Sequence, residues 1–142
     1  MLHRDTQSLV PEFRRLVEEL IKQLSEKKIP YFISETKREP IVQKAYYAQG
    51  RDDLVMVNQL RHAAGLAPIS PSENNRKITW TLNSHHMTGK AIDIYPMKDG
   101  SILWNGTEED WKPIVEIAEA LGIEWGGRWT EKDMPHFQQR RS

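Results

Sequence analysis

The sequence contains no cysteine, and this absence excludes disulfides, thiolate metal sites and cysteine nucleophiles together. It also lacks an excess of either charge, because 20 Lys and Arg balance 20 Asp and Glu. No global field therefore draws the chain to nucleic acid or to a membrane surface. Affinity for any partner must come from a local site, for which five His and the carboxylates are the remaining metal ligands.

Long apolar runs are missing as well. No stretch approaches the roughly 20 apolar residues of a membrane span, and residues 1–7 lack the apolar run of a signal peptide. We therefore expect synthesis in the cytoplasm without a signal peptide, no stable membrane insertion, and dependence on other proteins for any export.

The chain has 142 residues, enough for one domain with a hydrophobic core and too few for a second of ordinary size. Apolar residues at three- and four-residue spacing predict an amphipathic helix over 9–24, with Ser8 as its N-cap. Asp52 is expected to cap another helix, and Pro113 to lie in the first turn of the last one. The remaining helices are expected at 39–49, 53–64 and 110–121.

Alternation of apolar and polar residues predicts short strands. They are expected at 31–35, 77–82, 91–95, 102–104, 123–125 and 135–138. Residues 65–75 are rich in Gly, Pro, Ser and Asn and should form a surface loop. Because strands and helices do not alternate regularly, we expect an α+β domain whose helices pack against a small, mainly antiparallel sheet.

Two short segments carry the chemistry. In the first, His86 precedes Asp93 by seven residues, with a glycine between them that suits a turn leading into a strand. The second, Asp133-Met-Pro-His136, adds a carboxylate and an imidazole. Two imidazoles and one carboxylate form a typical catalytic zinc ligand set, which leaves a position open. In isolation, ordinary polar residues of a loop and a strand would also account for these spacings.

In its motifs the chain resembles the LAS zinc peptidases. The family pattern Ser-x-His-x-x-Gly-x-Ala-x-Asp matches from Ser84 to Asp93, and the acidic-x-x-His pattern matches at Asp133 and His136. The segment 35–51 and the Trp-Gly-Gly at 125–127 are similar too. Within the group, the match is to D-alanyl-D-alanine carboxypeptidases, VanY-like D,D-peptidases and, most of all, the L-alanyl-D-glutamate peptidases of phage endolysins.

The resemblance implies roles for particular residues. His86, Asp93 and His136 would bind Zn²⁺, and Asp133 would act as the general base. Arg38 would neutralise a developing oxyanion or hold a substrate carboxylate, the alternative being a surface salt bridge. Two further residues, Ser84 and Gln43, are candidates for substrate binding.

Residues 1–142 would then be a single zinc peptidase catalytic domain with a hedgehog/D,D-peptidase-like fold. Its expected substrate is the stem peptide of peptidoglycan, cleaved by a monomer as an L-alanyl-D-glutamate endopeptidase of endolysin type that acts on the cell wall. The alternatives are a D,D- or L,D-carboxypeptidase, and a zinc-binding module without catalysis.

Overall fold

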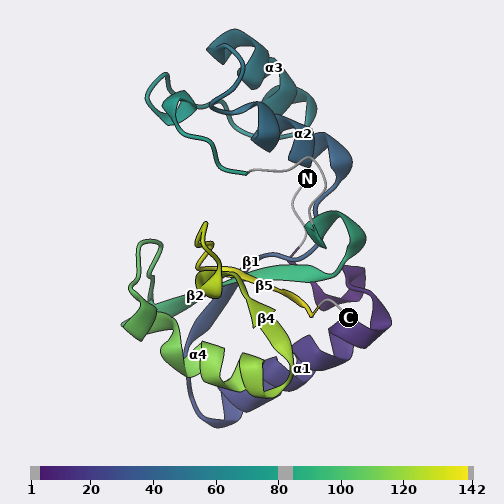
Figure 1. The fold of residues 1–142 in the computed structure, drawn as a ribbon, viewed down its shortest axis with the longest axis vertical. Helices are drawn as coiled ribbons and strands as arrows, with labels where there is room; N and C mark the ends of the chain where they lie inside the picture. The colour runs from purple at the N-terminus through teal and green to yellow at the C-terminus, as the bar shows by residue number, and fades with distance from the viewer. Residues whose placement is uncertain (1–3, 80–84, 141–142) are drawn as a thin grey trace.

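The computed structural model describes residues 4–79 and 85–140, and it arranges them in two parts (Figure 1). The larger part is a sheet with helices α1 (Pro11–Glu26) and α4 (Glu108–Ala120) packed together on one side of it. The smaller part holds α2 (Pro40–Ala48) and α3 (Leu54–Ala63), which lie beyond the sheet, at the end of the molecule opposite α1 and α4.

The main hydrophobic core lies between the sheet and the helices α1 and α4. Helix α1 begins at Pro11, whose fixed φ and missing N–H suit a first helical position. Its apolar stripe is buried at Phe13, Val17, Leu20 and Leu24. These side chains share one cluster with Trp111 and Ile114 of α4 and with Ile92, Ile94 and Phe137 of the sheet.

The sheet is antiparallel throughout the pairs described. Its strands are β1 (Tyr31–Glu35), β2 (Ala91–Lys98), β3 (Ser101–Ile102), β4 (Ile123–Trp125) and β5 (His136–Gln139). Their order is β1-β2-β5-β4, and β3 forms a hairpin with β2. Register places Asp93 opposite both Glu35 on β1 and His136 on β5. Because Ile92, Ile94 and Phe137 point into the core, Asp93 and His136 must point away from α1 and α4.

The helices α2 and α3 have a small apolar cluster of their own. Its buried members are Val42, Ala45 and Ala64, and Tyr46, Leu60 and Leu66 pack against them. The connection from β1 to α2 is hydrogen-bonded to the short 3-10 helix His85–Thr88, because the Arg38 backbone N–H donates to the His86 carbonyl at 2.8 Å. This contact ties the helical part to the segment that carries His86.

Three of the expected helix starts were wrong. Val10, not Ser8, precedes α1, and the Ser8 hydroxyl instead contacts the Thr36 hydroxyl at 2.9 Å. Asp53, not Asp52, caps α3, by accepting from the Met56 N–H at 2.9 Å.

The last helix begins at Glu108, so Pro113 lies inside it rather than in its first turn. Pro113 is exposed, and water can therefore satisfy the carbonyl that its missing N–H leaves unpaired. The Thr107 N–H donates to the Asp110 carboxylate at 2.8 Å and fixes this earlier start.

The strand predictions fared better. The strands at 31–35, 91–95, 123–125 and 135–138 are confirmed, with β2 extending to Lys98. Strand β3 spans Ser101–Ile102 only, so the predicted stretch up to Trp104 was too long. Of the expected strand at 77–82, residues 77–79 are not in a strand, and the rest lies outside the described residues.

Candidate metal centre

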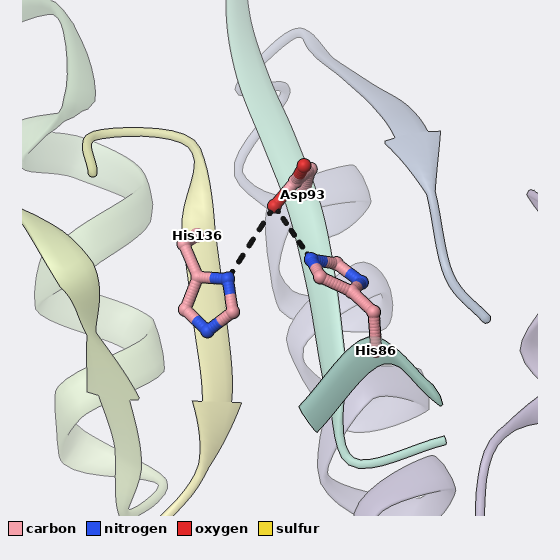
Figure 2. Close-up of side chains that lie close together, drawn as sticks. All are labelled: His86, Asp93 and His136. Carbon is pink, nitrogen blue, oxygen red and sulfur yellow. Dashed lines mark hydrogen bonds and ion pairs between the residues drawn. The ribbon is translucent and has the colours of Figure 1, made fainter. Parts of the chain in front are cut away.

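Three elements bring His86, Asp93 and His136 together (Figure 2). His86 comes from the short 3-10 helix His85–Thr88, Asp93 from β2 and His136 from β5. The Asp93 Oδ1 atom lies 3.1 Å from His86 Nε2 and 3.7 Å from His136 Nδ1. One ligand atom from each residue lies within 4.8 Å of the others, which makes the group able to hold a metal ion. Both histidines are buried, at 2% and 6% exposure.

Hydrogen bonds on the far side of each ring determine which nitrogen faces the cluster. The His86 Nδ1–H donates to the Thr36 carbonyl at 3.1 Å, because a carbonyl can only accept. The His136 Nε2–H donates to the Gln138 side-chain oxygen at 2.8 Å. The lone pairs of His86 Nε2 and His136 Nδ1 are therefore both directed at Asp93. Such a partner on the second nitrogen is the usual arrangement for a metal-binding histidine.

The electrostatics of the group favour an ionised carboxylate. Burial alone would raise the pKa of Asp93, but the two imidazoles beside it hold that pKa well below its ordinary value. Burial would lower the pKa of His136, but the negative charge of the neighbouring Asp93 carboxylate raises that pKa instead. A carboxylate that stays ionised between two imidazoles is ready to bind a cation.

Asp133 lies at the edge of the same group, with Oδ2 3.9 Å from His136 Nδ1. Its side chain is 51% exposed, so solvent or substrate can reach the carboxylate. Loss of surrounding water and the negative charge of Asp93 raise the pKa of Asp133. Its N–H donates to the Gly126 carbonyl at 3.0 Å. A Cβ at Gly126 would lie 2.5 Å from the Asp133 carbonyl oxygen, so only glycine allows this approach.

Arg38 is buried in a polar cluster between β1 and α2, and it is not a surface residue. Its Nη1 donates to Gln43 Oε1 at 2.7 Å, and its Nε and Nη2 donate to one oxygen of Glu35. Its guanidinium also lies 4.7 Å from the centre of the Tyr46 ring. Asp93 is close enough to contribute to the raised pKa of Arg38, although burial opposes that rise. Arg38 and Gln43, which the sequence named separately as site candidates, are thus hydrogen-bonded to each other.

The roles assigned to these residues stay predictions, and the Ser84 prediction lies outside the described residues. Sequence reasoning missed other polar residues on the same face of the sheet. Glu35 is 5% exposed and lies opposite Asp93 in the register, a position that its place three residues before Arg38 could have suggested. Tyr95 follows Asp93 by two residues, and burial together with the nearby carboxylates raises its pKa to about 12.

Comparison with known families bears on this centre. Residues 77–139, which include all three residues of the group, match the family described as D-alanyl-D-alanine carboxypeptidase. The resemblance seen in the motifs is thereby confirmed.

Two proteins with similar sequences are named as L-alanyl-D-glutamate peptidases. A stretch of 65 residues is 48% identical to the peptidoglycan L-alanyl-D-glutamate endopeptidase CwlK of Bacillus subtilis and covers 39% of this chain. A stretch of 66 residues is 36% identical to the L-alanyl-D-glutamate peptidase of Listeria phage A118 and covers 45% of this chain. The matches cover only 38% and 24% of those proteins, so the chain spans well under half their length.

Solved structures show the same fold. The L-Ala D-Glu endopeptidase ChiX of Serratia marcescens matches with a TM-score of 0.62 and 22% identity, over 99% of this chain and 89% of that one. The vancomycin resistance D,D-pentapeptidase VanY, an E175A mutant in complex with Zn(II), matches with a TM-score of 0.56 and 14% identity. That match covers 98% of this chain and 78% of the other. The predicted α+β fold, with helices against an antiparallel sheet, is confirmed.

Proposed function

We propose that this protein is a zinc-dependent peptidoglycan peptidase that cleaves the stem peptide between L-alanine and D-glutamate. The observation that carries the proposal is the convergence of His86, Asp93 and His136, with the reachable carboxylate of Asp133 beside them. The match of residues 77–139 to a peptidase family supports a hydrolytic role for that group.

The donor set of the centre fits zinc. Two imidazole nitrogens and one carboxylate oxygen face each other with their lone pairs, an arrangement that repels itself unless a proton or a metal ion lies among them. His86 Nε2, Asp93 Oδ1 and His136 Nδ1 would hold the ion. Bound zinc would supply a Lewis acid that polarises a carbonyl oxygen and makes a water molecule more acidic.

The surrounding residues then divide the remaining work. Asp133, exposed and with a raised pKa, would accept a proton from the attacking water and pass it to the leaving amine. Arg38, held in place by Glu35 and Gln43, would supply positive charge to the carbonyl oxygen or to a carboxylate of the substrate. The presence of both groups at the centre argues against a zinc-binding module without catalysis.

Two kinds of peptidase activity, endopeptidase and carboxypeptidase, are consistent with this centre. The relatives named as L-alanyl-D-glutamate peptidases favour the endopeptidase, and so does the likeness to ChiX. The likeness to VanY, which has also been solved in complex with D-alanine-D-alanine, keeps a D,D-carboxypeptidase as the second candidate. An L,D-carboxypeptidase would fit the same ligand set.

The setting of the reaction is part of the proposal. A stem-peptide substrate implies action at the cell wall. No helix in the described residues has the length and apolar character needed to cross a bilayer. We propose that residues 1–142 act as one catalytic domain and as a monomer.

Digestion of purified muropeptides, followed by mass spectrometry of the new termini, tests the proposal. New D-glutamate N-termini are expected with the zinc-loaded protein and not after treatment with a chelator. Release of D-alanine would replace the endopeptidase by a carboxypeptidase. Absence of any cleavage by zinc-loaded protein would reject both. The His86→Ala variant serves as the control, because it removes one ligand at the same centre.

A further inference from the structure

A hydrogen-bonded chain runs from His136 away from the metal group. The Gln138 side-chain oxygen accepts from His136 Nε2 at 2.8 Å, and the Gln138 amide nitrogen donates to Glu124 Oε2 at 3.2 Å. The same Glu124 oxygen accepts from the indole N–H of Trp129 at 2.9 Å. Gln138 is 1% exposed, so the middle of this chain is shielded from solvent, while Glu124 and Trp129 are partly buried.

The pairing of β4 with β5 places the members of this hydrogen-bonded chain side by side. Glu124 and Gln138 are direct register partners on β4 and β5. Gln138 follows His136 by two residues, so both side chains lie on the same face of the sheet. The Trp129 ring, 5.0 Å from the His136 ring, closes the chain on itself.

Only one orientation of the Gln138 amide suits these partners. An ionised carboxylate can accept but not donate, so the amide NH₂ must face Glu124 and the amide oxygen must face His136. That oxygen accepts a hydrogen bond only if His136 carries its proton on Nε2. A flipped amide would present NH₂ to Nε2 and favour the proton on Nδ1, where Asp93 would accept it. His136 Nδ1 would then have no lone pair for a metal.

We propose that Glu124 is a positioning residue for the metal centre, acting through the amide of Gln138 to keep His136 Nδ1 available as a ligand. Trp129 supports this role of Glu124. Its indole N–H can only donate, so the Glu124 oxygen that it contacts must be an acceptor. The inference rests on the proposed zinc centre and extends it to residues that touch neither metal nor substrate.

Variants of Glu124 test this through zinc affinity, measured by competition with a chelator. Glu124→Leu removes the acceptor and should weaken zinc binding roughly 10- to 100-fold, the usual effect of losing a partner of a metal-binding histidine. Glu124→Gln keeps an oxygen that Trp129 holds in place, so its affinity should equal that of the natural protein. Glu119→Leu, which removes an exposed ion pair with Arg128, is the matched control and should leave the zinc affinity unchanged.

A second readout separates positioning from a general structural effect. In zinc-loaded protein, NMR should show a slowly exchanging, hydrogen-bonded His136 Nε2–H in the natural chain and in Glu124→Gln, but not in Glu124→Leu. Should Glu124→Leu fail to fold, the double variant Glu124→Gln, Trp129→Phe replaces it, since its amide is free to flip. Glu124→Gln alone and Trp129→Phe alone should keep the zinc affinity of the natural protein. The double variant should bind zinc on the order of 10-fold more weakly.

The outcomes are distinct. Natural affinity and an unchanged Nε2–H signal in folded Glu124→Leu, or in the double variant, would overturn the inference. A loss in Glu124→Gln as large as in Glu124→Leu would also overturn it, because charge rather than amide orientation would then be the cause. If the natural protein itself binds no zinc, the proposed function fails together with the inference.

Discussion

Replacement of Asp133 by asparagine isolates the proposed base from the rest of the centre. The two side chains have nearly the same shape, and the backbone contacts of Asp133 to Gly126 and His136 do not involve its carboxylate. Its only described ion pair is the one to His136 at 3.9 Å, beyond hydrogen-bond distance, and the side chain is half exposed. The variant should therefore fold, with a stability change of about 0.5 kcal/mol or less.

The expected loss of activity is much larger than this change in stability. Removal of a general base costs about 10²- to 10⁴-fold in rate, equivalent to roughly 3 to 5 kcal/mol in the activation free energy at about 1.4 kcal/mol per factor of ten. We expect this loss in the kcat/KM for release of D-glutamate N-termini from a muropeptide. Zinc affinity, measured in parallel by chelator competition, should change little, because Asp133 is not one of the proposed ligands.

Glu131→Gln is the matched control, because it removes an exposed carboxylate only two residues away. It should leave both kcat/KM and zinc affinity unchanged. Undiminished turnover by zinc-loaded Asp133→Asn would refute the assignment of the base. A loss of zinc equal to the loss of activity would show instead that Asp133 acts as a ligand.

Further changes test the neighbouring residues. His136→Ala should abolish most zinc binding and all useful activity, and full occupancy by elemental analysis would exclude His136 as a ligand. Arg38→Lys should lower kcat if the guanidinium stabilises the oxyanion, or raise KM alone if it holds a substrate carboxylate; no change in either would remove Arg38 from the site. Gly126→Ala should lower activity at least tenfold, because its Cβ would lie 2.5 Å from the Asp133 carbonyl oxygen, and a fully active variant would contradict this. In metal-free protein the Asp133 carboxyl should titrate above its ordinary pKa of 3.8, since loss of water and the charge of Asp93 both disfavour ionisation. Asp93→Asn should lower that pKa as followed by ¹³C NMR, and an unchanged midpoint would show that the two carboxyl groups do not interact.

Local patterns in the sequence were sufficient for most elements, and the resemblance to a family pattern was needed to single out the three residues of the centre. The spacing of His86, Asp93 and His136 within recognisable motifs predicted that they lie together, and they do. Helix boundaries were less predictable. The start of α4 is fixed by the hydrogen bond between Thr107 and Asp110, whereas Pro113 had favoured a later start. Pro113 can lie inside the helix because it is exposed, and water can pair with the carbonyl that it leaves without a donor.

The sequence by itself determined the residue types of the candidate metal centre and most of the strands, because motif residues, their spacing and the two-residue alternation of strands are local properties. The tertiary structure alone decided which ring nitrogens face the cluster and what holds Arg38. The pairing of Glu124 with Gln138 depends on the register between β4 and β5, and the pairing of Arg38 with Glu35 depends on the path from β1 to α2. Glu124 and Gln138 lie 14 residues apart on different strands, so they meet only when the packed core fixes the strand register. Glu35 and Arg38 are only three residues apart, but the chain path after β1 decides whether their side chains meet.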